Sequence, residues 1–350
     1  MNREIKISMG IWGNTNLRDR FNPNGFKEDV SVQDRIKEIG SIKGIKGIEL
    51  HYPTEIDDDN YKDIEKVLND NDMSIVQLCG HTWVDKDFKF GALGHPDGIV
   101  RKKAVKRVKE ALDMADHFKV PISVLWPACT GSDFPLQSNY IRMYDDYLSS
   151  VRTLLDYIHR NKYVTKLALE PKPFEPRSYI LAGTTAQALT LVNEIGDDSF
   201  GINYDIGHSL IAKENPEDQL ALICRYRKLF HTHFNDNDQQ CDADLPPGTV
   251  GILRLVKSLF ILDETHYSGW HGLDLFPYRD EAAKYMRMSR NNLEAGYAVV
   301  DVLKEKGVSS LQKDCEKGPE ISQLVLETLM SGDAYHRARD KYTDEEWRVC

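Results

Sequence analysis

A short apolar run at residues 167–169 ends in an acid and a lysine two residues apart, Glu170 and Lys172. Alternate side chains of a β-strand share a face, so this spacing would point both groups into one cavity. A carboxylate and an ammonium are costly to bury unless each is paired or bound to a ligand. We therefore interpret the pair as part of a functional site.

Other polar residues end or follow further apolar runs of the chain. Each has an ordinary explanation by itself, because a strand-end His is usually hydrogen-bonded, Asp caps helices and Trp packs in cores. Several carboxylates aimed at one place would repel each other unless a cation neutralised them, and a mixture of Asp, Glu and His suits a divalent metal. The residues concerned are His51, His81, Trp126, Asp205, His208, His233, Asp242, Asp244 and Asp274.

Two metal ions are the economical prediction for this set. Carboxylates shared between two ions hold them at the short separation that paired-metal sites need, and Asp205 would be the bridge. The oxygen-rich ligands with an imidazole in each group favour Mg, Mn or Co, so we expect one or two such ions per chain. The first ligand group would be Glu170, Asp205, His233 and Asp274, and the second Asp205, His208, Asp242 and Asp244.

The elements that must position these side chains alternate along the chain. Eight apolar, β-rich runs are separated by amphipathic stretches of helical period, such as residues 105–118, 144–158, 185–195 and 249–262. This order predicts an α/β fold, a (β/α)8 TIM barrel, with its chemistry at the carboxyl ends of the strands. The eight runs are Ile5–Trp12, Gly47–His51, Ser74–Gly80, Ile122–Trp126, Lys166–Glu170, Phe200–Asp205, Leu229–Phe234 and Gly269–Phe276.

An open doubly wound sheet is the alternative fold. It is disfavoured because the first run is followed by Trp12-Gly-Asn-Thr-Asn rather than by a Gly-rich phosphate turn. We expect the barrel to occupy residues 1–306, closed by a helix over 280–306. Residues 307–350 would form a short C-terminal extension, which is either an arm laid on the barrel or a neighbouring subunit, or a frayed tail.

Composition excludes several classes of protein. The net charge of −10 and the lack of a basic stripe with aromatic residues argue against nucleic-acid binding. The start of the chain lacks a signal-peptide apolar region, and no apolar run is long enough to cross a membrane. Six scattered cysteines without a Cys-x-x-Cys pair suggest neither a zinc knuckle nor a disulfide framework, so we expect a cytoplasmic protein.

The site motifs resemble those of xylose isomerase over most of residues 5–306. The stretch from Glu170 to Arg177, Glu-Pro-Lys-Pro-Phe-Glu-Pro-Arg, is similar to that family's metal-and-lysine motif. Residues 205–208, Asp-Ile-Gly-His, resemble its second-metal motif with Asp in place of Glu. Residues 229–233, Leu-Phe-His-Thr-His, and 242–244, Asp-Ala-Asp, resemble further ligand segments.

The resemblance also implies roles around a sugar pocket. His51 would assist ring opening, Trp12 and Trp126 would flank the open chain, and Lys172 would hydrogen-bond the carbonyl-end oxygen. Phe21 would reach into a neighbouring subunit's pocket, which implies a homo-oligomer. Asp244 is implied as a catalytic metal ligand, and His81 and Leu93 as substrate-binding residues, Leu93 standing where the family has a wall Phe.

Departures from the family pattern keep two activities open. His233 stands where xylose isomerases have an Asp, and the Asp that orients the ring-opening His falls at Thr54, beside Glu55. An imidazole without its carboxylate partner is held less well in tautomer and orientation. The first hypothesis is a metal-dependent aldose–ketose isomerase working by hydride shift. The second is a lyase or epimerase that abstracts a proton from an oxidised sugar, for example a 3-keto C-glycoside deglycosidase with a small partner subunit.

A non-enzymatic sugar-binding or scaffold barrel is the third interpretation. The intact Lys172 and the complete second ligand group count against it. In all three cases the expected ligand is a small-molecule sugar or glycoside.

Overall fold

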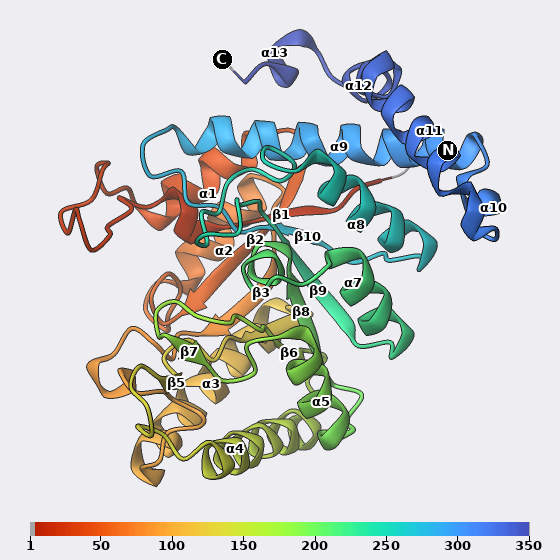
Figure 1. The fold of residues 1–350 in the computed structure, drawn as a ribbon. Helices are drawn as coiled ribbons and strands as arrows, with labels where there is room; N and C mark the ends of the chain where they lie inside the picture. The colour runs from red at the N-terminus through yellow and green to blue at the C-terminus, as the bar shows by residue number, and fades with distance from the viewer. Residues whose placement is uncertain (1–3, 350) are drawn as a thin grey trace.

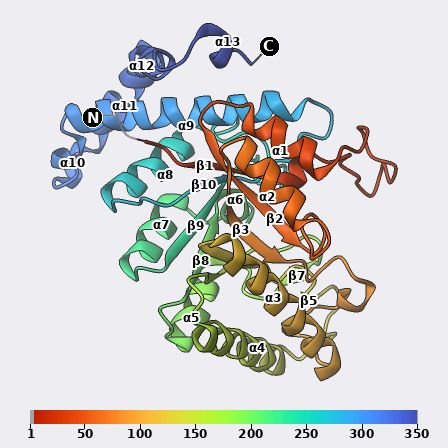
Figure 2. The ribbon, with the colours of Figure 1, turned by 180° about the vertical axis from the view of Figure 1, so that it is seen from behind.

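Eight parallel strands close into a barrel in the computed structural model, which describes residues 4–349 (Figures 1 and 2). Neighbours in the barrel are neighbours in the chain, and the last strand closes it by pairing with the first at Ile7 and His271. Each connection between parallel strands crosses the outside of the barrel and contains at least one helix. The predicted (β/α)8 architecture is confirmed. The strands are β1 Ile7–Gly10, β2 Ile45–Tyr52, β3 Ser74–Gly80, β4 Ile122–Leu125, β6 Lys166–Leu169, β8 Phe200–Asp205, β9 Leu229–Phe234 and β10 His271–Leu273.

Three of the eight strands have the bounds expected from the sequence, β3, β8 and β9. The first and last strands are shorter than expected at the catalytic end. A 3-10 helix, Ile11–Asn14, follows β1 directly and turns Trp12 out of the strand, and Asp274 lies one residue beyond β10. Apolar patterning does not distinguish a strand from the buried loop that continues it, so the expected runs were too long at these ends.

Several of the helices begin or end at recognisable caps. In α5 the Thr184 hydroxyl and the Gln187 side chain form a capping box, and Gly196 ends the helix in the left-handed region with φ 69°. In α3 the Asp97 side chain accepts from the Ile99 amide, so this helix begins earlier than residue 105. The helices around the barrel are α1 Val32–Gly40, α2 Tyr61–Asp70, α3 Gly98–Phe118, α4 Tyr140–Asn161, α5 Thr185–Ile195, α6 Ile206–Ile211, α7 Pro216–Arg225, α8 Ile252–Glu264 and α9 Ala282–Glu305.

The loops at the carboxyl ends of the strands build the rim of the site. Two of them, after β4 and β6, pair as a small antiparallel ribbon of β5 (Gly131–Ser132) and β7 (Tyr179–Ile180). Gly131 is required there, because a Cβ atom would lie 1.9 Å from the Tyr179 carbonyl oxygen. Buried apolar residues of the strands and of the helices form one large core cluster, which makes the strand ends a rigid platform.

Residues after α9 form an arm that lies along α9 of the same chain, on the side away from the barrel (Figure 1). The buried Arg290 guanidinium of α9 anchors its end by donating to the backbone carbonyl of Glu346 and, at 2.6 Å, to that of Lys43. The same guanidinium lies 4.0 Å from the ring centre of Tyr342. The arm contains α10 Val308–Leu311, α11 Gly318–Ser331, α12 Asp333–Arg339 and α13 Asp344–Trp347.

No helix among residues 4–349 is both long and apolar enough to cross a bilayer. The five cysteines in this part of the chain are all free thiols.

Candidate metal centre and substrate cavity

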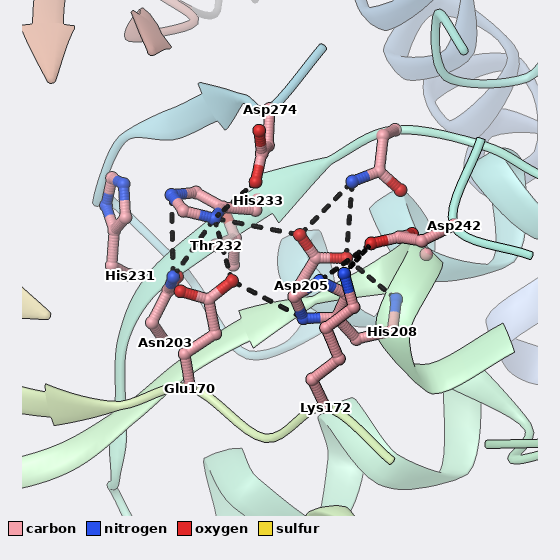
Figure 3. A network of polar contacts seen from close by, with 12 residues as sticks. Glu170, Lys172, Asn203, Asp205, His208, His231, Thr232, His233, Asp242 and Asp274 are labelled. Atoms are coloured by element: carbon pink, nitrogen blue, oxygen red, sulfur yellow. Dashed lines mark hydrogen bonds and ion pairs between the residues drawn. The ribbon is translucent and has the colours of Figure 1, made fainter. Parts of the chain in front are cut away.

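Four successive strands of the barrel deliver one cluster of acidic and imidazole groups (Figure 3). Glu170 follows β6, Asp205 ends β8, His233 lies in β9 opposite Asp205, and Asp274 follows β10. One ligand atom from each of the four lies within 4.8 Å of all the others. The Nδ1 atom of His233 is 3.2 Å from Glu170 Oε1, 3.6 Å from Asp205 Oδ2 and 3.7 Å from Asp274 Oδ2. The structure thus brings the first predicted ligand group together.

The Asp-Ile-Gly-His stretch is shaped by local hydrogen bonding. Asp205 ends its strand and caps α6, because its Oδ1 accepts from the His208 amide at 2.9 Å. The Asn235 side chain donates to the same carboxylate at 3.1 Å. Gly207 lets Asn235 come this close, since a Cβ at that position would lie 2.0 Å from its Oδ1. The Asp-Ile-Gly-His motif therefore supplies the Asp205 carboxylate and also fixes its orientation.

Electrostatics at the cluster favour a cation. Burial, against the opposing charge of His233 and with the charges of Asp205 and Glu170, raises the pKa of Asp274 to about 6. Burial would lower the pKa of His233, but the carboxylates of Glu170 and Glu49 hold it well above its ordinary value. Two buried carboxylates and one partly buried carboxylate around one imidazole are a donor set that a divalent cation neutralises and binds. Glu170, Asp205, His233 and Asp274 fit such an ion.

The second predicted group is arranged around Lys172. Its Nζ lies 2.7 Å from Asp242 Oδ2, and His208 Nε2 lies 3.0 Å from the same oxygen. Among residues 4–349, Asp205, His208, Asp242 and Asp244 do not form a second four-residue cluster of converging ligand atoms. The buried Oδ1 atoms of Asp242 and Asp244 nevertheless make no hydrogen bond with the described residues. Their role as ligands stays a prediction, and so does the bridging role of Asp205.

Charges around Lys172 keep it protonated. Burial lowers the pKa of Lys172, but Asp242 and Asp244 outweigh burial and raise it above its ordinary value. Burial also lowers the pKa of His208, and Asp205 and Asp242 together raise it to about 9. The Lys172 ammonium lies 5.5 Å from the ring centre of Trp126, which borders the cavity. Lys172 is thus a fixed positive charge beside the candidate metal cluster of Glu170, Asp205, His233 and Asp274.

The structure corrects the expectation that His51 lacks a carboxylate partner. Glu55, 5% exposed, turns back so that its Oε2 lies 3.1 Å from His51 Nδ1 and accepts from the His51 amide at 2.7 Å. Burial raises the pKa of Glu55, but the charge and hydrogen bonds of His51 outweigh this and lower it. Thr54 instead bonds to the Nδ1 of His81 at 2.5 Å. The carboxylate partner of His51 lies one residue after the position that the family pattern indicates, because the path of the loop after β2 depends on tertiary contacts.

A cavity of about 350 Å³ joins these groups at the carboxyl end of the barrel. Three tryptophans form its apolar wall, and the ring of Trp12 lies 4.5 Å from that of His51. Trp12 also donates from Nε1 to Asp274 Oδ1 at 2.6 Å. Predicted residues that line the cavity are Trp12, His51, His81, Trp126, Glu170, Lys172, His208, His233, Asp242, Asp244 and Asp274.

Two predicted pocket residues lie elsewhere. Leu93 is buried in the apolar core, and the cavity lining contains Trp83 instead, whose ring packs 4.8 Å from that of Trp126. Leu93 is not among the residues that line the cavity, and its predicted role in substrate binding stays a prediction. Phe21 is 80% exposed on the loop after β1 and does not line this chain's cavity. Its predicted reach into a neighbouring subunit stays a prediction.

Buried residues beneath the cavity escaped sequence reasoning. Glu49 lies within β2, where its Oε2 is 2.9 Å from His233 Nε2 and its Oε1 is 3.0 Å from His231 Nε2. Asn203 packs its amide nitrogen 3.2 Å from His233 Nδ1. A Glu inside the apolar run of β2 was the available signal for Glu49, because an unpaired charge there would be costly.

The chain is a (β/α)8 TIM barrel that carries, at the carboxyl ends of its strands, a carboxylate and imidazole cluster that could hold a metal ion. The model of the xylose isomerase-like TIM barrel family matches residues 34–294, and the chain belongs to that family.

Similar proteins include sugar isomerases and epimerases. Xylose isomerase of Thermus thermophilus is 26% identical over 288 residues, covering 77% of this chain and 71% of that protein. The crystal structure of a D-tagatose 3-epimerase-like protein superposes with a TM-score of 0.68 at 19% identity, covering 85% of this chain and 98% of the other. The 3-keto-D-glucoside 4-epimerase of E. coli gives 0.62 at 18% identity, covering 82% and 97%. At these identities the structural matches establish the fold.

Proposed function

We propose that this protein is a divalent-metal-dependent aldose–ketose isomerase acting on a free monosaccharide by hydride shift. The observation that carries the proposal is the His51–Glu55 pair, which shares one cavity with Lys172 and with the cluster around His233. A sugar isomerase needs a proton-transfer group for ring opening as well as a site that polarises neighbouring oxygens.

His51 would transfer the proton during ring opening. Glu55 holds its Nδ1, which leaves Nε2 for the sugar, as a carboxylate does when it fixes the tautomer of a catalytic imidazole. The ring of Trp12 lies against the imidazole and restricts its rotation. The three tryptophans would exclude water from the open chain.

Lys172 would stabilise negative charge on the carbonyl-end oxygen. Its ammonium is already oriented by Asp242, so little reorganisation would be needed when the sugar binds. A divalent ion held by Glu170, Asp205, His233 and Asp274 would supply Lewis acidity toward adjacent sugar oxygens.

Ketose formation from a panel of aldopentoses and aldohexoses, with Mn, Mg or Co added, tests the proposal. We expect one aldose to be converted, and Glu170→Gln to abolish both metal binding and turnover. A matched surface control is Glu320→Gln, which changes the same group on the arm. If no aldose yields ketose with any of the three metals, the proposal is wrong.

A second candidate is an epimerase or lyase that abstracts a proton from an oxidised sugar. It is favoured by His233 in the ligand cluster, where the resemblance to xylose isomerase implied an Asp, and by the structural similarity to the E. coli epimerase. A substrate deuterated at C2 separates the two. Deuterium retained in the product supports hydride shift, whereas hydrogen from the solvent entering the product supports proton abstraction.

A further inference from the structure

Glu49 is a fully buried carboxylate beneath the candidate metal cluster. Its side chain is 1% exposed and lies inside the barrel, on a strand well away along the chain from those that carry the cluster. Its two oxygens have separate partners, His233 Nε2 at 2.9 Å and His231 Nε2 at 3.0 Å. The Ser8 hydroxyl donates to Oε1 at 2.7 Å. A buried charge with three such partners is well satisfied.

The neighbouring strands leave room for this carboxylate. A Cβ atom at Gly272 would lie 2.4 Å from Glu49 Oε1, 2.8 Å from His233 Cδ2 and 2.9 Å from His231 Nε2. Gly272 therefore stands where a larger residue would displace Glu49 or the His233 ring. β1, which carries Ser8, and β10, which carries Gly272, thus both accommodate Glu49.

The two nitrogens of His233 face different groups. Nε2 points at Glu49, and Nδ1 points at the carboxylates of the cluster, with the Asn203 amide nitrogen also 3.2 Å from it. A neutral imidazole carries one proton, so a ring that donates from Nε2 presents a lone pair on Nδ1. We propose that Glu49 is a positioning residue that holds the Nε2 proton of His233 and so turns the Nδ1 lone pair toward the divalent ion, an inference that rests on the metal site of the proposed function.

The Glu49, His231 and His233 atoms also lie within 4.8 Å of one another. They do not converge on a common point, because the imidazoles bond to different oxygens of Glu49 at hydrogen-bonding distances. Hydrogen bonding from a ligating His to a carboxylate orients the ring and increases its basicity. The arrangement serves His233 rather than a separate ion.

Mn²⁺ affinity by titration calorimetry of the full chain tests the inference. Glu49→Gln keeps the shape but loses the charge, and we expect its Kd to rise 10- to 100-fold. We expect the visible absorption spectrum of bound Co²⁺ to change as well, because the imidazole would no longer be held in one orientation. Glu294→Gln is the matched control, a buried carboxylate bonded to Lys341 and Tyr342 beneath the arm, and should leave Kd and spectrum unchanged.

Ser8→Ala is a milder second variant, which removes one donor to Glu49 without touching a ligand. Loss of about 1 kcal/mol of hydrogen bonding corresponds to roughly a fivefold rise in Kd. If Glu49→Gln does not fold, this variant decides. Wild-type Mn²⁺ affinity in the folded variants would overturn the inference.

The outcomes separate the inference from the proposed function. If Glu49→Gln weakens metal binding and the wild-type protein isomerises no aldose, the inference is supported and the isomerase proposal is refuted. Tight wild-type binding that Glu49→Gln leaves intact refutes the inference alone. A wild-type chain that binds no divalent ion refutes both.

Discussion

Replacing Glu55 with Gln removes the charge that faces His51 while keeping the shape of the side chain. The amide oxygen of Gln can still accept from the His51 backbone, a bond of 2.7 Å in the wild type. What is lost is the charged interaction across 3.1 Å between Oε2 and His51 Nδ1. The variant therefore tests the effect of Glu55 on the orientation and charge of the His51 imidazole, while the loop after β2 keeps its fold.

A hydrogen bond to a charged group contributes about 1.5–3 kcal/mol, and about 1.4 kcal/mol corresponds to tenfold in rate. If this bond acts fully in the transition state of ring opening, kcat/KM should fall roughly 10- to 150-fold. The Mn²⁺ affinity should stay unchanged, because Glu55 is not part of the cluster around His233.

Steady-state kinetics on the best aldose, with calorimetry of Mn²⁺ binding, measure both quantities. Thr54→Ala is the matched control, since Thr54 contacts His81 rather than His51, and should lower kcat/KM less than threefold. A Glu55→Gln enzyme with wild-type kcat/KM would refute the role of the pair. Loss of metal binding in that variant would show that Glu55 acts through the metal site instead.

Lys172→Met should lower kcat at least 100-fold with the fold intact, by steady-state kinetics, because it removes the charge beside the carbonyl-end oxygen and leaves Asp242 with His208 alone as its charged partner. A wild-type rate would contradict that role. Mn²⁺ at 100 times its Kd should stabilise the wild type by about 2.7 kcal/mol in denaturant unfolding, and Glu170→Gln should lose this gain. Equal stabilisation of both proteins would exclude Glu170 as a ligand. Arg290→Met should lower the free energy of unfolding by about 2–4 kcal/mol, because it leaves the carbonyls of Lys43 and Glu346 without their donor. An unchanged unfolding curve would show that the arm does not depend on this anchor. Burial and the charge of His51 lower the pKa of His81 to about 3 from its ordinary 6.5. As the pH falls, His81 is therefore protonated in the unfolded chain at a higher pH than in the folded chain. Stability should therefore fall as pH drops from about 6.5 toward 3, by at most ~1.4 kcal/mol per pH unit from this group, and His81→Gln should flatten that slope in unfolding curves.

The sequence predicted the fold because the periodicity of the chain is strong. Alternating apolar strands and amphipathic helices specify a (β/α)8 barrel, and the rule that chemistry lies at the carboxyl ends of the strands located Glu170, Asp205 and His233. These residues lie in or immediately after strands, where the register of the barrel leaves little freedom.

The errors fall on loops and on the buried interior. Glu55 was not recognised as the partner of His51, and Trp83 was not recognised as part of the cavity wall, because a loop's path depends on its tertiary contacts. Glu49 was missed because its partners come from β9, far along the chain, and pair with it only when the barrel closes.

The sequence by itself determined the barrel, its catalytic end and the chemical types of the groups gathered there, since local periodicity and strand position are properties of neighbouring residues. Only the tertiary structure decided which nitrogen of His233 faces the carboxylate cluster, which acid supports His51, and that Lys172 pairs with Asp242. These are contacts between distant segments within hydrogen-bonding range, and barrel closure fixes them through geometry that no local pattern encodes.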